Sequence, residues 1–169
     1  MTGFVGIISK SGFQNASIQK IAEAFSFTDN HKIGRNYQTE NAFLQQTTLN
    51  KFMADKLFCE DHDVLIAIEG IILNSSELML ANETLFEAVK RLYLFEKEEF
   101  VSRLKGDFSG VVYDKCNHQW VVFTNQTGAK RIFYYQNNDF LLFSSELNAL
   151  SEVMRILKIK LSLNKSAAY

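Results

Sequence analysis

The chain has 169 residues, of which 47% are hydrophobic and 22% are charged, and its formal net charge is −1. This length and composition indicate a globular protein with its own core rather than a disordered chain. The small net charge gives no electrostatic argument for binding nucleic acid, and no apolar run approaches the roughly 18 residues that would cross a membrane. Two isolated cysteines, Cys59 and Cys116, indicate neither a disulfide framework nor a zinc site. We therefore expect a cytoplasmic protein without a metal or another cofactor.

The N-terminal third predicts one strand and one helix. Phe4–Ile8 is a short apolar run, typical of a buried strand. Ser17 is placed to cap a helix, and the helical spacing predicts an apolar face, formed by Ile18, Ile21, Ala22 and Phe25. The polar segment Thr28–Glu40 is expected to be a loop.

The middle of the chain predicts further short strands and a well-capped helix. Apolar runs occur around Ala42–Leu44, Lys56–Cys59 and Val64–Ile68, and Gly70 is expected to interrupt the last one. Asn74 to Glu77 resembles a helix start. Thr84 and Glu87 have the spacing of a capping box, and the helix that follows is predicted to bury Leu85, Ala88, Val89, Leu92 and Phe95. A second short helical stretch is expected at Phe100–Leu104.

The chain after Asp107 changes to the two-residue period of strands. Four apolar runs separated by polar turns predict antiparallel hairpins, at Phe108–Tyr113, Trp120–Thr124, Ile132–Tyr135 and Phe140–Phe143. A last helix is expected to open at Ser145 and to run toward Met154. Helices that are segregated from antiparallel strands indicate the α+β class. We expect one domain over residues 1–155 and an exit linker over 156–169.

The first residues carry a chemical signal. If Met1 is removed, Thr2 carries both a hydroxyl nucleophile and a free α-amine, whose ordinary pKa of about 8 suits a base. This is the arrangement used by N-terminal nucleophile hydrolases. A plain first strand that happens to follow Met-Thr is the simpler interpretation of these residues alone.

Five segments, taken in order, resemble the class II glutamine amidotransferase domain of asparagine synthetases. The family begins Met-Cys-Gly-Ile-x-Gly, and this chain begins Met-Thr-Gly-Phe-Val-Gly. The other segments that resemble family motifs are Glu69–Asn74, Phe100–Asp114, Gly128–Tyr134 and Phe143–Leu150. The resemblance covers nearly the whole chain and implies a four-layer αββα sandwich of antiparallel sheets.

The resemblance also implies a partner. In the full-length relatives this domain precedes an ATP-pyrophosphatase synthetase domain, whose Ser-Gly-Gly-x-Asp phosphate loop does not occur in this sequence. We therefore expect the partner to be such a synthetase domain, missing from this chain, and glutamine to be the candidate ligand. No nucleic acid or membrane partner is expected. The isolated domain is expected to self-associate, for example as a homodimer.

Residue by residue, the resemblance implies a departure from the family's glutaminase site. Thr2 stands at the position of the cysteine nucleophile. Gly70 keeps the backbone amide of the oxyanion hole, but Glu69 replaces the oxyanion asparagine, and Ile71 replaces the glutamate that follows. Glu83 is the remaining candidate to bind the substrate α-amine.

The arginine that clamps the substrate carboxylate is also missing. It belongs on the strand before the oxyanion segment, where this chain has Gln45-Gln46-Thr47-Thr48, and neutral side chains do not replace a bidentate, charge-assisted pair. Two hypotheses follow. The domain is either an inactive structural or docking module of an amidoligase, or an active amidohydrolase that uses Thr2.

Overall fold

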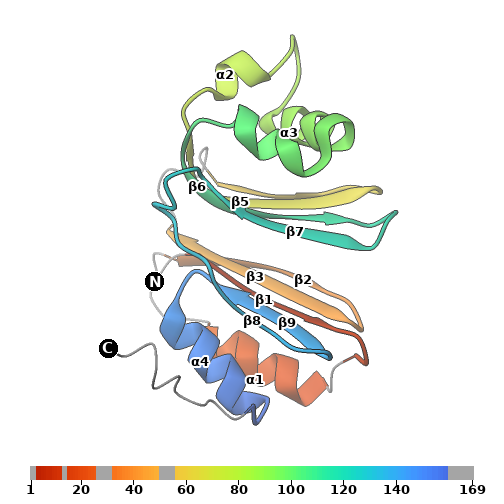
Figure 1. Cartoon of the computed structure of the whole chain (residues 1–169), viewed down its shortest axis with the longest axis vertical. Helices are drawn as coiled ribbons and strands as arrows, with labels where there is room; N and C mark the ends of the chain where they lie inside the picture. The colour runs from red at the N-terminus through yellow and green to blue at the C-terminus, as the bar shows by residue number, and fades with distance from the viewer. Residues whose placement is uncertain (1–2, 13–14, 26–31, 50–55, 160–169) are drawn as a thin grey trace.

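The protein is a sandwich of two antiparallel β-sheets between two helical layers (Figure 1). The computed structural model describes residues 3–12, 15–25, 32–49 and 56–159. From one side to the other the layers are helices, a four-stranded sheet, a five-stranded sheet and helices. The α+β class and the αββα arrangement predicted from the sequence are both confirmed.

The first sheet contains the N-terminal strand at its centre. Its strand order is β2-β3-β1-β9-β8. The strands are β1 (Gly3–Ser9), β2 (Lys32–Gln38), β3 (Ala42–Leu49), β8 (Phe133–Gln136) and β9 (Phe140–Ser144). Helices α1 (Asn15–Phe25) and α4 (Leu147–Ile156) cover its outer face. The core between them includes Ile7, Ile18, Ile21, Leu142, Leu150 and Val153.

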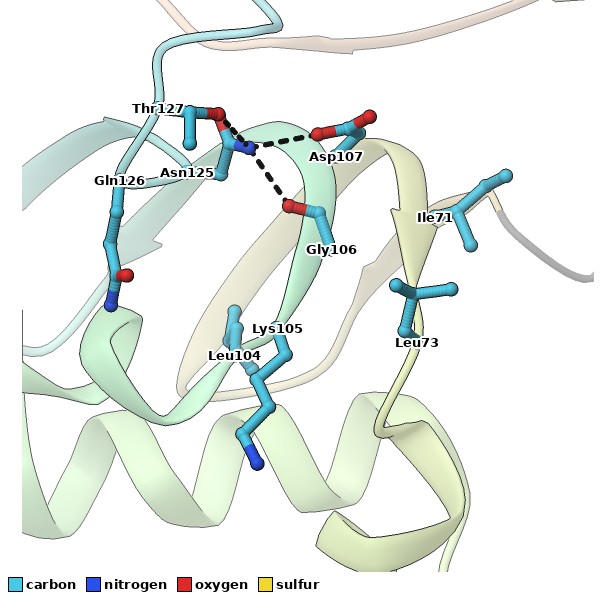
Figure 2. Close-up of a pocket in the computed structure, with 9 residues that line it drawn as sticks. All are labelled: Ile71, Leu73, Leu104, Lys105, Gly106, Asp107, Asn125, Gln126 and Thr127. Atoms are coloured by element: carbon cyan, nitrogen blue, oxygen red, sulfur yellow. Dashed lines mark hydrogen bonds between the residues drawn. The ribbon is translucent and has the colours of Figure 1, made fainter.

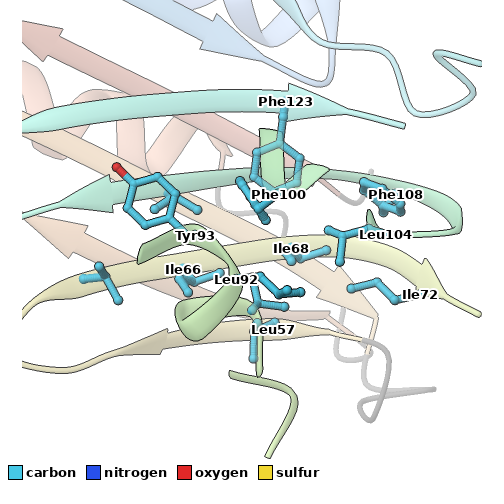
Figure 3. Close-up of a cluster of buried hydrophobic side chains, with 13 residues drawn as sticks. Leu57, Ile66, Ile68, Ile72, Leu92, Tyr93, Phe100, Leu104, Phe108 and Phe123 are labelled. Carbon is cyan, nitrogen blue, oxygen red and sulfur yellow. The ribbon is translucent and has the colours of Figure 1, made fainter. Parts of the chain in front are cut away.

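The second sheet has the order β4-β5-β6-β7. Its strands are β4 (Leu57–Glu60), β5 (Val64–Ile72), β6 (Gly106–Asp114) and β7 (Gln119–Thr124). Its outer face packs against α3 (Leu85–Glu96) and the 3₁₀ helix η2 (Lys97–Arg103), with the short α2 (Ser75–Leu78) beside them. Phe100 is fully buried at the centre of this core, where it makes edge-to-face contacts with Tyr93 and Phe123 (Figure 3).

Strand β5 is buried on both faces because helices cover one face and the other sheet covers the opposite one. Ile66 and Ile68 belong to the cluster under the helices, whereas Leu65 and Ala67 belong to the cluster between the sheets. Side chains alternate along a strand, so the next side chain on the inter-sheet face is that of Glu69.

The helix boundaries follow local signals. Thr84 caps α3, and the predicted capping box is present, with Thr84 accepting from the Glu87 amide and Glu87 accepting from the Thr84 amide. The predicted helices near Ser17, Asn74, Phe100 and Ser145 are also present as α1, α2, η2 and α4, within a few residues of the expected starts. Ser17 itself lies inside α1, which begins at Asn15, so the prediction that it caps this helix was wrong.

Three further expectations were wrong. Residues 32–38 of the expected loop form β2, which lies at the edge of its sheet among the described strands and pairs there with β3. An edge strand does not need an apolar sequence. Gly70 does not interrupt β5, which pairs with β6 as far as Ile72. Phe95 is 87% exposed because the buried face of α3 runs through Ala88, Val89, Leu92 and Tyr93.

The predicted domain boundary at residue 155 falls in the last turn of α4. The amides of Leu157 and Ile159 still donate to Val153 and Met154, so residues 156–159 continue the end of this helix. The rest of the predicted linker, from residue 160, lies outside the described residues. The boundary therefore stays a prediction.

Candidate functional site

The start of β1 opens into a cavity between the two sheets. Its volume is about 300 Å³. It is lined by Gly3, Glu69, Ser109, Ala129, Lys130, Arg131, Phe133, Ser145 and Glu146. The cavity therefore joins residues from both ends of the chain and from the middle, including Glu69, which the family resemblance predicts at the oxyanion position.

The junction of β9 and α4 fixes the first residues of β1. The Phe4 amide donates to Ser145 Oγ, the Ser145 amide donates to the Phe4 carbonyl, and Ser144 Oγ donates to the same carbonyl, each at 3.0 Å. Gly3 has φ +146°, and a Cβ there would lie 1.8 Å from Ser145 Oγ, so only glycine fits. Thr2 lies outside the described residues, and its role as nucleophile stays a prediction.

Glu69 is 2% exposed and is one of the residues that line this cavity. One carboxylate oxygen, Oε1, lies 2.5 Å from Lys56 Nζ. The other, Oε2, accepts from Gln46 Nε2 at 3.3 Å, and the same nitrogen donates to the Ile68 carbonyl at 3.1 Å. Both oxygens of the carboxylate are thus engaged by protein donors from β3 and from the start of β4.

Strand register explains the approach of Lys56. Leu57 on β4 is paired with Ile68 on β5, and the two strands are antiparallel. Lys56, which precedes Leu57, therefore lies opposite Glu69, which follows Ile68. Leu57 and Ile68 pack under the helices, which places Lys56 and Glu69 on the inter-sheet face. The ion pair therefore follows from the register and needs no special loop conformation.

Gly70 is required by the backbone itself. It has φ +123°, and a Cβ at this position would lie 2.1 Å from the Asp107 carbonyl oxygen on β6. A side chain would break the β5–β6 pairing at this point. The presence of Gly70 is therefore explained by packing and does not by itself indicate an oxyanion hole.

Ile71 lines a second cavity, of about 350 Å³, at the end of β5 and β6 (Figure 2). Its side chain is 48% exposed. Asn125 connects the wall of this cavity by donating from Nδ2 to the Gly106 carbonyl, to Asp107 Oδ1 and to Thr127 Oγ1, as the dashed lines show. Ile71 is absent from the residues that line the first cavity.

Glu83 is engaged elsewhere. Its two carboxylate oxygens accept from Nε and Nη2 of Arg91, each at 2.9 Å, and the Leu80 amide donates to it as well. The Arg91 guanidinium, together with the Leu80 amide, lowers the pKa of Glu83 to about 2. The structure does not bring Glu83 to the cavity that Gly3 and Glu69 line, so its role toward a substrate amine stays a prediction.

Strand β3 presents neutral polar groups where a clamp arginine is expected. Gln45, Gln46 and Thr47 are each at most 5% exposed. Their side-chain oxygens (Oε1, Oε1 and Oγ1) have no hydrogen-bond partner within the described part of the chain. The strand therefore offers amide and hydroxyl groups, but no positive charge, to the interior.

Comparison with known proteins identifies the family. A family model described as a glutamine amidotransferase domain matches residues 53–152, which is more than half of the chain. The chain belongs to this glutamine amidotransferase domain family. Among solved structures, it is similar to glutamine phosphoribosylpyrophosphate amidotransferase from B. subtilis, complexed with ADP and GMP, with a TM-score of 0.61 and 11% identity. A comparison with curated proteins found no match.

The similarity to the solved amidotransferase covers 89% of this chain and 43% of that one. At 11% identity this similarity shows the fold alone. In this amidotransferase domain the described residues include no helix long and apolar enough to cross a membrane. They also contain no cluster of three side chains suited to a metal ion.

Sequence reasoning missed four charged residues of the site in this amidotransferase domain. Lys56 pairs with Glu69, and Lys130, Arg131 and Glu146 line the cavity. The signal for Lys56 was available in the alternation of β4 against β5. The other three could not be assigned to one cavity from local sequence, because the β7–β8 connection and the β9–α4 junction meet only in the folded chain.

Proposed function

We propose that this is an asparagine synthetase-type amidotransferase domain whose glutaminase site has degenerated. In this proposal the domain serves as the structural or docking module of an ATP-dependent amidoligase, with an ATP-pyrophosphatase synthetase domain as its partner. The five sequence segments that resemble the asparagine synthetase family support this assignment within the amidotransferase family. The chain's 43% share of the solved amidotransferase is consistent with a partner domain outside this sequence.

The observation that carries the proposal is the environment of Glu69. An oxyanion hole requires a hydrogen-bond donor aimed at the developing negative charge, and an ionised carboxylate can only accept. Lys56 and Gln46 each engage one oxygen of this carboxylate. Loss of one oxyanion donor alone slows acyl transfer by roughly 10²–10³-fold.

The missing clamp arginine also argues against hydrolysis of glutamine. A glutamine substrate in the family's orientation needs a cation on β3, and the buried groups there are Gln45, Gln46 and Thr47. A side-chain amide binds a carboxylate much more weakly than a guanidinium does through a bidentate, charge-assisted pair. The proposed site therefore has two independent defects, one at the oxyanion position and one at the clamp. Together they favour a complete loss of glutamine hydrolysis rather than slower hydrolysis.

The alternative function is an active amidohydrolase in which Thr2 releases ammonia from glutamine. One observation favours it: the Lys56 ammonium offsets the charge of Glu69 at 2.5 Å, which weakens the repulsion of an oxyanion nearby. Gly3 also lines the cavity, and Thr2 is its neighbour in the chain. This alternative requires removal of Met1, because only then does Thr2 have a free α-amine.

The experiment is a glutamate-release assay on the purified chain, with its N-terminus defined by mass spectrometry. We expect no turnover in the wild type, in Thr2→Ala or in Thr2→Cys. Turnover that Thr2→Ala abolishes would establish the amidohydrolase and refute the proposal. Activity that appears only in Thr2→Cys would place the defect in the nucleophile rather than in Glu69 and the missing clamp.

A further inference from the structure

We propose that Lys130, Arg131 and Glu146 form a relocated clamp for the charged head of a free α-amino acid. In this arrangement the side-chain amide of the ligand points toward Glu69, and the domain binds an amino acid with a carboxamide side chain without hydrolysing it. The inference rests on the proposed function in one respect, namely that the ligand stays intact. It assigns binding to residues outside β3, which contributes none of the described residues that line this cavity.

The three head-group residues are available for a ligand. Lys130, Arg131 and Glu146 all line the 300 Å³ cavity. None of their side chains forms a hydrogen bond or an ion pair with another residue in the described ranges. By contrast, Glu69 is paired with Lys56, and Lys90 is paired with Asp61. Three unpaired charges around one cavity therefore point to a charged ligand.

The signs of these charges specify the class of ligand. Two cations suit one carboxylate, and charge-assisted hydrogen bonds of this kind are roughly twice as strong as neutral ones. The single anion, Glu146, suits an ammonium group beside that carboxylate. A zwitterionic α-amino acid presents both groups on one carbon atom. The cavity is at the small end of the range for ligand sites, which fits a molecule of that size.

The loop that carries the two cations is held in shape. Asn125 Oδ1 accepts from the Ala129 amide at 3.0 Å, and the Asn125 carbonyl accepts from the Gly128 amide at 3.0 Å. Two bonds donated by Asn125 Nδ2, to the Gly106 carbonyl and to Asp107 Oδ1, tie the same loop to β6. Such preorganisation lowers the entropy cost of binding. The cations are thus presented on an anchored connection between β7 and β8.

Glu69 distinguishes a ligand with a side-chain amide from one with a side-chain carboxylate. Glu69 engages Lys56 and Gln46 with one bond to each oxygen, and a carboxylate has further lone-pair positions for a donor. An amide NH₂ can donate to it, whereas a second carboxylate has only acceptors and the same charge. We therefore expect glutamine or asparagine to bind in preference to glutamate or aspartate.

The test is calorimetric titration of the full chain with L-glutamine, L-glutamate and glutaramate, which lacks the α-amine. Lys130→Gln/Arg131→Gln removes both cations, and Arg103→Gln on η2 is a matched control away from the cavity. We expect L-glutamine to bind the wild type and the control equally. The double variant should weaken this binding about tenfold or more. Glu146→Gln should weaken L-glutamine but leave glutaramate unchanged, a pattern that a merely structural effect would not produce.

The inference is overturned if L-glutamine does not bind the wild type at about 10 mM, in the weak range of affinities, or if the double variant binds it as well as the wild type does. It is also overturned if L-glutamate binds as tightly as L-glutamine. Glutamate formed in the same samples is measured separately. Turnover would refute the proposed loss of hydrolysis, and the clamp would then be judged by whether the double variant raises KM about tenfold.

Discussion

Lys56 and Glu69 form an ion pair across the end of β4 and β5, with 2.5 Å between Nζ and Oε1 and with side chains that are 13% and 3% exposed. Removing one partner of a buried pair leaves the other charge uncompensated, which commonly costs several kcal/mol. The pair therefore ties the stability of the second sheet to Glu69, the residue that we predict at the oxyanion position.

Substitution Lys56→Met should lower the free energy of unfolding by about 3 kcal/mol, because Glu69 then remains buried with one neutral donor. The double variant Lys56→Met/Glu69→Leu should recover much of this loss, since neither charge is left behind. Urea unfolding of the two single variants and the double variant gives the coupling energy. Strictly additive losses would show that the two groups do not depend on each other.

Gly70→Ala should destabilise the protein by more than about 2 kcal/mol, because the backbone has a left-handed φ and the new Cβ would meet the Asp107 carbonyl. Gly34→Ala is the matched control: its backbone is ordinary, and a Cβ there has only Gln45 Nε2 near it, at 3.9 Å. Thermal unfolding of both variants tests the difference. Equal melting temperatures would contradict the strain assigned to Gly70.

Asn125→Ala should cost about 2 kcal/mol, since it removes the partners of two partly buried backbone groups, the Gly106 carbonyl and the Ala129 amide. The residue is 8% exposed and bonds to Gly106, Asp107, Thr127 and Ala129. Asn137→Ala, in the exposed turn between β8 and β9, is the control. If the loop is preorganised as proposed, Asn125→Ala also weakens amino-acid binding without changing the charge of the cavity. Unchanged binding in a folded variant would count against that role.

The Glu83–Arg91 pair predicts a pH dependence. The folded pKa of Glu83 is about 2, below its ordinary value of 4.5, so the unfolded chain binds the proton first as the pH falls. The stabilisation is complete above about pH 4.5 and is lost toward pH 2. The melting temperature of the wild type should therefore exceed that of Glu83→Gln at pH 6, and the gap should close at pH 2–3. A gap that stays constant would refute the linkage.

The control for this measurement is Glu40→Gln, an exposed carboxylate in the turn between β2 and β3. It has no ion pair with another residue in the described ranges. Its melting temperature should follow that of the wild type across the same pH range.

Much of the fold could be predicted because its signals are local. The capping box at Thr84 and Glu87 involves residues three apart, and the apolar faces of α1 and α3 repeat at helical spacing. Hairpins in the second half alternate apolar and polar residues around short turns. Where the local signal was weak, the prediction was wrong. Strand β2 was expected to be a loop because its sequence is polar, but it is an edge strand that is held by pairing with β3.

The sequence by itself determined the class of the protein, since the order of its family-like segments can be read from the chain, and it supplied the prediction that Glu69, Gly70 and Ile71 occupy the oxyanion segment. Only the tertiary structure decided what those residues contact. It paired Glu69 with Lys56 and Gln46, directed Glu83 to Arg91, and brought Lys130, Arg131 and Glu146 around one cavity. The physical reason is that charge pairing depends on strand register and on the stacking of two sheets. Both join residues that are distant in sequence.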